Sequence, residues 1–100
     1  MEARVASIKD VPAGTMIGVE SSGQKIVVAN VSGSYYAIGN ICTHRGCKLS
    51  QGTLNDDKVQ CPCHRSIFDI KTGAVVKGPA TKPESSFKVR VDGDSLMVTI

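Results

Sequence analysis

The four cysteines and the two histidines of this chain all lie in two short windows. The first window is ICTHRGCKL, residues 41–49, and the second is CPCHRSIFD, residues 61–69. Thiolate and imidazole groups are good ligands for iron and zinc, and loops on a rigid sheet commonly carry binding chemistry. The chain must therefore fold so that two separate loops meet at one metal site.

The order of ligand types within each window separates the possible metals. The windows read Cys42-x-His44 and Cys61-x-x-His64, so each supplies one cysteine and one histidine. A Cys2His2 zinc finger has two closely spaced cysteines followed by two histidines, which is a different order. One thiolate and one imidazole from each loop suit a two-iron cluster in which each loop gives one ligand to each iron.

The rest of the chain shows a period of two, which is typical of strands. Residues 87–93 and 95–100 alternate apolar with polar side chains around a Gly-containing turn and predict a β-hairpin. Residues 78–86 carry two prolines and predict a loop, and no segment has a clean helical stripe. The pattern predicts an all-β, antiparallel sandwich or partly open barrel. Further strands are expected at 15–20, 25–31, 34–39, 58–61 and 67–70, and a turn with a brief extended piece at 72–78.

Composition restricts the class of protein further. One hundred residues is the length of one domain, and a net charge of +3 without a Lys/Arg run does not favour nucleic-acid binding. The longest apolar runs are IVVA and YYAI, far shorter than the roughly 20 residues of a membrane helix. The first residues lack the apolar stretch of a signal peptide. We therefore expect a soluble, cytoplasmic protein with no membrane span.

The two windows resemble the signature of the Rieske iron–sulfur proteins, C-x-H followed by C-x-x-H. The match covers CTHRGC, CPCH, the FD and TG that follow, and GPA at 78–80. The resemblance implies one [2Fe-2S] cluster, with Cys42 and Cys61 on one iron and His44 and His64 on the other. A plant-type cluster on all four cysteines does not fit, because the spacing C-x4-C-x13-C-x-C differs from that pattern.

The same resemblance implies the Rieske fold over nearly the whole chain. We expect one domain, residues 1–100, made of an antiparallel β-sandwich base and an inserted cluster-binding subdomain. The base would cover about residues 1–40 and 81–100, and the subdomain about 41–80.

The other residues of the two windows are interpreted through the same family. Its high-potential members have a disulfide at the positions of Cys47 and Cys63, which implies one here; two reduced thiols are the alternative in a reducing cytosol. Ser66 matches a serine whose hydroxyl donates to a bridging sulfide, and Pro79 matches a loop that covers the cluster. Phe68 stands where those members have a tyrosine donor, so we expect an intermediate reduction potential.

The resemblance implies an electron carrier. We expect a monomeric, soluble Rieske-type ferredoxin that moves one electron at a time between a reductase and an oxidase or oxygenase. Arg45, Lys48 and Arg65 flank the expected cluster and would form a basic collar for an acidic redox partner. The chain is not expected to be an enzyme, because a Rieske oxygenase needs further histidines for a mononuclear iron and the cluster takes both.

Two other functions use the same residues. One is a structural zinc or redox-sensing regulatory module, which would be colourless with one zinc ion. The other is a fixed subunit of a larger oxidoreductase, such as an assimilatory nitrite reductase or an arsenite oxidase complex.

Overall fold

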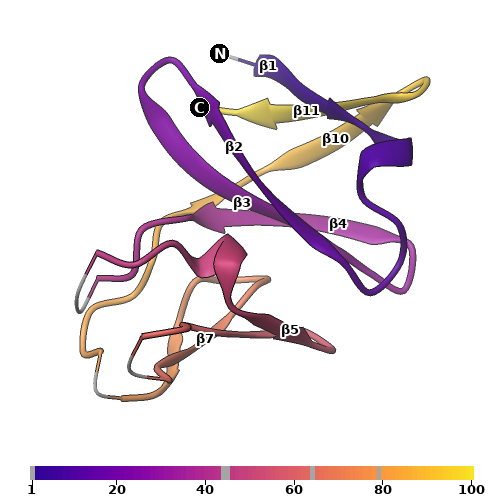
Figure 1. Ribbon diagram of the computed structural model, residues 1–100. Coiled ribbons are helices and arrows are strands. Elements are labelled where there is room, and N and C mark those ends of the chain that lie inside the picture. Colours follow the sequence, from indigo (N-terminus) through magenta and orange to yellow (C-terminus); the bar gives the residue numbers. More distant parts are fainter. Residues whose placement is uncertain (1, 44–45, 64, 79) are drawn as a thin grey trace.

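The structure is a computed structural model that describes residues 2–43, 46–63, 65–78 and 80–100. Within these residues the chain forms three antiparallel sheets, which lie one above the other in Figure 1. The upper sheet is β1–β11–β10, the central sheet is β2–β3–β4–β9 and the lower sheet is β5–β6–β7–β8. The strands are β1 Glu2–Ser7, β2 Met16–Ser21, β3 Gln24–Val31, β4 Ser34–Gly39, β5 Thr53–Asn55, β6 Lys58–Gln60, β7 Ile67–Asp69, β8 Val75–Lys77, β9 Ser86–Phe87, β10 Val89–Asp92 and β11 Ser95–Thr99.

Strand β3 explains why the central sheet can be covered on both faces. Residues 26–29 are apolar at every position and fully buried. Because successive side chains of a strand point to opposite faces, Ile26 and Val28 pack into the core toward the upper sheet, while Val27 and Ala29 pack into the core toward the lower sheet. A continuous apolar run is what a strand buried on both faces requires.

The lower sheet carries the second window of ligand-type residues. Strands β6 and β7 pair in antiparallel fashion, Gln60 opposite Ile67, so the residues between them form the turn of a hairpin. The first window leaves the end of β4 and returns through the 3-10 helix η2, Leu49–Gln51, into β5. The two windows therefore approach each other beside the core that lies between the central and lower sheets.

The all-β antiparallel prediction is confirmed, and the expected strands and the hairpin of β10 and β11 are present. Three strands were not predicted: β1, which has six residues, and the shorter β5 and β9. The prediction of a loop over 78–86 was wrong at its last residue, because Ser86 pairs with Ile38 of β4. Val91, on the apolar side of the β10 alternation, remains 47% exposed at the edge of its sheet.

The helices in the described part of the chain are very short. They are the 3-10 helices η1, Ile8–Asp10, and η2, with three residues each. Neither approaches the length needed to cross a bilayer.

Candidate metal centre

The two windows form loops with the same backbone closure. In loop 1, residues 42–47, the N–H of Cys42 donates to the Cys47 carbonyl at 2.7 Å, and the Cys42 carbonyl accepts from the N–H of Gly46 at 2.9 Å. In loop 2, residues 61–66, the Cys61 N–H donates to the Ser66 carbonyl at 2.8 Å, and its carbonyl accepts from Arg65 at 3.2 Å. Each loop is therefore a compact turn that begins at a cysteine.

The first cysteine of each loop is buried. Cys42 is 2% exposed and Cys61 is 1% exposed, and both belong to the core between the central and lower sheets. The apolar side chains of that core include Leu49, Val59 and Phe68. The two thiol-bearing residues thus meet in a dry environment at the place where the two loops converge.

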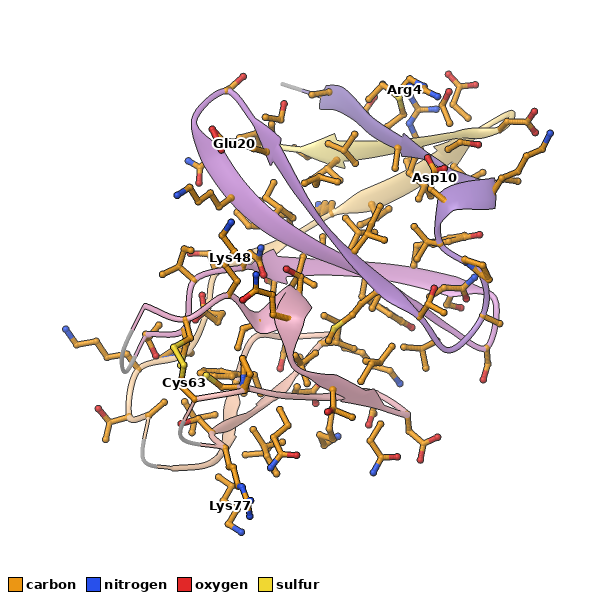
Figure 2. The ribbon with its side chains drawn as sticks, in the orientation of Figure 1. Arg4, Asp10, Glu20, Lys48, Cys63 and Lys77 are labelled. Atoms are coloured by element: carbon orange, nitrogen blue, oxygen red, sulfur yellow. A yellow bond between two sulfur atoms is a disulfide. The ribbon has the colours of Figure 1, made fainter. Side chains whose placement is uncertain are left out.

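The other two cysteines link the loops covalently. Cys47 and Cys63 form a disulfide, with their Cα atoms 6.4 Å apart. Figure 2 shows this bond, labelled at Cys63, toward the edge of the molecule. The bond is the one that the family resemblance implies, and it leaves Cys42 and Cys61 as thiols.

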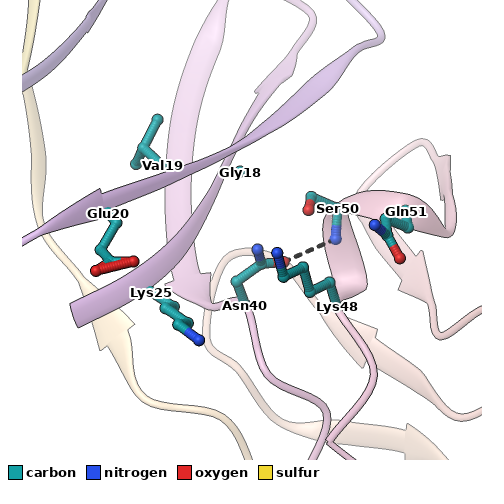
Figure 3. A pocket seen from close by; sticks show the side chains of 8 residues that line it. All are labelled: Gly18, Val19, Glu20, Lys25, Asn40, Lys48, Ser50 and Gln51. Atoms are coloured by element: carbon teal, nitrogen blue, oxygen red, sulfur yellow. Dashed lines mark hydrogen bonds between the residues drawn. The ribbon is translucent and has the colours of Figure 1, made fainter. Parts of the chain in front are cut away.

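Asn40, two residues before loop 1, ties the chain on the two sides of the loop together. Asn40, 4% exposed, accepts the N–H of Ser50 on its side-chain Oδ1 at 2.8 Å and the N–H of Leu49 on its carbonyl at 2.7 Å. Figure 3 shows the Asn40–Ser50 bond at the side of a polar recess that Lys25 and Lys48 also line. These bonds attach η2, which follows loop 1, to the end of β4.

Loop 2 is held by Ala80, which belongs to the segment that the family resemblance implies to cover the cluster. The Oγ of Ser66 accepts the backbone N–H of Ala80 at 3.0 Å, and the Ser66 side chain is completely buried. Since the Oγ acts as acceptor in that bond, its own proton can be donated to another acceptor. Phe68, two residues further on, is also completely buried and offers no hydroxyl there.

Several expected site residues lie outside the described part of the chain: His44, Arg45, His64 and Pro79. Among the expected docking residues that are described, Lys48 and Arg65 are both exposed. Arg65 has a φ of 62°, in the left-handed region that favours glycine.

Sequence reasoning missed one residue near loop 1. Glu84 follows Pro83 in a polar segment, where a surface position would be expected, yet it is only 8% exposed. Burial is the main cause that raises the pKa of Glu84 to about 7, and a hydrogen bond from the backbone of Thr43 opposes that rise. Nothing in a single sequence marks this carboxyl as buried, because its neighbours come from distant segments.

The donor set fits an iron–sulfur cluster. Two buried thiols begin two matching loops, while the remaining cysteines are consumed in a disulfide. Thiolates are the protein ligands that iron–sulfur clusters use, and imidazoles replace half of them in Rieske centres. The apolar core beneath them limits the access of water from that side, which influences the reduction potential of such a centre.

Comparison with known proteins agrees with this geometry. The model of the Rieske [2Fe-2S] domain family matches residues 1–96. The 3-phenylpropionate/cinnamic acid dioxygenase ferredoxin subunit of Shigella flexneri serotype 5b is 37% identical over 94 residues, 93% of this chain and 88% of that protein.

Solved structures give the same result. The ferredoxin of carbazole 1,9a-dioxygenase from Nocardioides aromaticivorans IC177 is similar with a TM-score of 0.93 and 30% identity, covering 98% of this chain and 96% of that one. A chain in the complex of reduced oxygenase and oxidised ferredoxin in carbazole 1,9a-dioxygenase gives a TM-score of 0.91 and 33% identity, covering 97% and 91%. The chain therefore belongs to the Rieske [2Fe-2S] domain family, as an electron carrier of the ferredoxin type rather than a catalyst.

Proposed function

We propose that the chain holds a single [2Fe-2S] cluster, with Cys42 and Cys61 on one iron and His44 and His64 on the other. The observation that carries this proposal is the pair of buried thiols at the start of two loops with matching closure. When bound, the cluster supplies one-electron chemistry. The protein's part is to supply the ligands, a dry surrounding and a position near the surface.

Replacing a ligand tests the assignment directly. We expect alanine at His44 or at His64 to abolish normal loading, because each imidazole would be one of four ligands. The matched control is Thr43→Ser, which keeps the hydroxyl that donates to the Lys82 carbonyl. Iron and acid-labile sulfide per chain, the visible spectrum and electron paramagnetic resonance are the measurements. A colourless wild-type protein with one zinc ion would instead support the regulatory module.

The partner that best fits the relatives is the oxygenase of an aromatic-ring dioxygenase system. The relatives are ferredoxin components of such systems, and one similar chain occurs in a complex with an oxygenase. In this role the chain accepts an electron from a reductase and passes it to the oxygenase. We further propose a monomer in the cytoplasm, whose base covers about residues 1–40 and 81–100 and whose cluster-binding subdomain covers about 41–80.

The docking surface is proposed to be the basic collar of Arg45, Lys48 and Arg65. Exposed cations around an electron exit raise the association rate with an acidic partner, and this effect weakens as salt increases. We expect Lys48→Glu combined with Arg65→Glu to slow electron transfer from the reductase or to the oxygenase at low ionic strength. Lys9→Glu combined with Lys88→Glu, two exposed positions in the base, is the control with the same change in net charge. An equal rate for both variants would refute the collar.

Ser66 is proposed to tune the cluster. Its buried hydroxyl accepts from Ala80 and can donate its proton toward a cluster sulfur, which would favour the reduced state. One hydrogen bond of about 1.4 kcal/mol corresponds to roughly 60 mV for a one-electron couple. We expect Ser66→Ala to lower the midpoint potential by that order. An unchanged potential in a fully loaded variant would remove this role.

A further inference from the structure

Glu84 is a buried carboxyl for which neither the ligand set nor the proposed docking surface has a use. Its Oε2 is buried and has no hydrogen-bond partner among the residues that the structure describes. A buried polar atom without a partner is unfavourable, so a carboxyl retained in such a place indicates a role that an apolar side chain could not fill.

The position of Glu84 is defined closely by two glycines. A Cβ on Gly39, the last residue of β4, would lie 2.6 Å from the Glu84 Oε1, so a side chain there would collide with the carboxyl. The main chain of Glu84 lies against Gly73, whose carbonyl accepts the Glu84 N–H at 2.8 Å. The carboxyl is therefore seated on the end of β4, where that strand runs into loop 1.

The carboxyl is directed at the ligand loop itself. The backbone of Thr43 lies close enough to the carboxyl to oppose the rise of its pKa, and Thr43 is the residue between the proposed ligands Cys42 and His44. The Thr43 hydroxyl also donates to the carbonyl of Lys82 at 2.7 Å. The segment 82–84 thus holds the middle of loop 1 through a hydrogen bond to the Thr43 side chain, and the Glu84 carboxyl lies beside the Thr43 backbone.

We propose that Glu84 is a positioning residue of the cluster site, whose carboxyl fixes the peptide between the two loop 1 ligands and thereby sets the electronic environment of the cluster. This inference rests on the ligand assignment proposed above. Glu84 acts through Thr43 and does not coordinate iron. Lys82 lies two residues before Glu84 on the same segment, and Lys25 lines the groove that Glu84 also lines.

Three variants distinguish an effect of the position of the Glu84 carboxyl from an effect of its charge and from a general loss of stability. Glu84→Ala removes the acceptor, Glu84→Gln keeps an acceptor oxygen, and Gly39→Ala displaces the carboxyl without deleting it. The matched control for general destabilisation is Val98→Ala, which truncates a fully buried side chain in the core toward the upper sheet. All variants are compared as cluster-loaded protein at pH 6. At this pH the Glu84 carboxyl of the wild type is mostly protonated, so it has the same charge as glutamine.

We expect Glu84→Ala and Gly39→Ala to change the reduction equilibrium about threefold or more and to shift the electron paramagnetic resonance g values. Glu84→Gln and Val98→Ala should keep both wild-type signatures. The double variant Gly39→Ala with Glu84→Ala should add nothing to Glu84→Ala, because both changes remove the same interaction.

The proposal is overturned if Glu84→Ala and Gly39→Ala lose only stability while potential and g values stay at their wild-type values. It is also overturned if Glu84→Gln behaves like Glu84→Ala. Failure of the ligand assignment would look different, because wild-type protein would then lack a [2Fe-2S] spectrum. If Glu84→Ala does not load iron, the potential and g values of Gly39→Ala are compared with those of the wild type instead.

Discussion

Loops 1 and 2 have the same backbone closure but are supported in different ways. The position four residues after the first cysteine has a positive φ in both loops, 76° at Gly46 and 62° at Arg65. Loop 1 meets this requirement with glycine, whereas loop 2 places a long charged residue in the same conformation. One geometry is thus reached by two residue types with different conformational energies.

The surroundings of the two loops differ as well. Loop 1 is held from outside by Asn40 at its base and by the segment 82–84 at its middle. Loop 2 has one side-chain bond of this kind among the described residues, from Ala80 to Ser66. We infer that loop 1 is held by the scaffold, while loop 2 depends more on the hairpin that carries it and on the disulfide.

Removing the disulfide should produce the largest loss of stability among these predictions. It should also remove the covalent support that loop 2 receives from loop 1. The bond spans 16 residues, and closing a loop of this size stabilises a protein by about 3 kcal/mol. We expect Cys47→Ser with Cys63→Ser to lower the free energy of unfolding by about that amount. Denaturant titration of loaded protein measures it, with Ser50→Ala as a control on the other side of loop 1.

Hydrogen exchange of the same double variant sharpens the comparison. We expect the amide of Arg65 in loop 2 to lose protection before the amide of Gly46 in loop 1, because the anchors of loop 1 remain. Equal loss of protection in both loops would contradict the difference inferred here.

The second prediction concerns pH and tests the support of loop 1. The pKa of Glu84 is raised to about 7 by burial, above its value of 4.5 in the unfolded chain. Between these values the folded state binds more protons than the unfolded state, so stability falls as pH rises. Once the pH is well above 7, the free energy of unfolding has fallen by about 3 kcal/mol in total. About 1 kcal/mol of this fall occurs between pH 6 and pH 8.

Glu84→Gln should remove this part of the pH dependence, and the measurement is the difference between the unfolding midpoints of the two proteins from pH 5 to pH 8. The carboxyls of Glu2 and Asp57 do not interfere, because hydrogen bonds to Arg90 and Lys58 lower their pKa values. Identical pH profiles for the variant and the wild type would show that the carboxyl does not titrate in this range.

The smallest expected effect comes from the matching positions with positive φ. We expect Gly46→Ala to destabilise the protein by about 1 kcal/mol, because a side chain in the left-handed region is strained. Among the described residues its Cβ would meet the Ile41 Cγ2 alone, at 4.0 Å, so we expect the effect to come from the backbone. Arg65→Gly should gain less than about 1 kcal/mol, since glycine also increases the entropy of the unfolded chain.

Thermal unfolding of Gly46→Ala and Arg65→Gly measures these two changes in stability. Arg65→Lys is the control, because it keeps both the charge and the backbone strain. A loss of stability in Arg65→Gly as large as that in Gly46→Ala would mean that the Arg65 side chain itself stabilises loop 2.

Much of this protein follows from its sequence, because the informative signals are local. The alternation over residues 95–100 predicts a strand, and Leu96 and Val98 are indeed its buried residues. The Cys and His spacing predicts the family, since ligands of one iron–sulfur cluster must occupy fixed positions in short loops. The pairing of Cys47 with Cys63 followed from the family resemblance rather than from the residues themselves.

Only the tertiary structure decided how these loops are held. Glu84 reads as a surface residue in a polar segment, and it is buried because β4, loop 1 and Gly73 close around it. Strand β1 was not predicted, since its pairing with β11 joins the two ends of the chain. A local pattern records which face of a segment is apolar, but contacts between distant segments depend on packing that no single window of sequence contains.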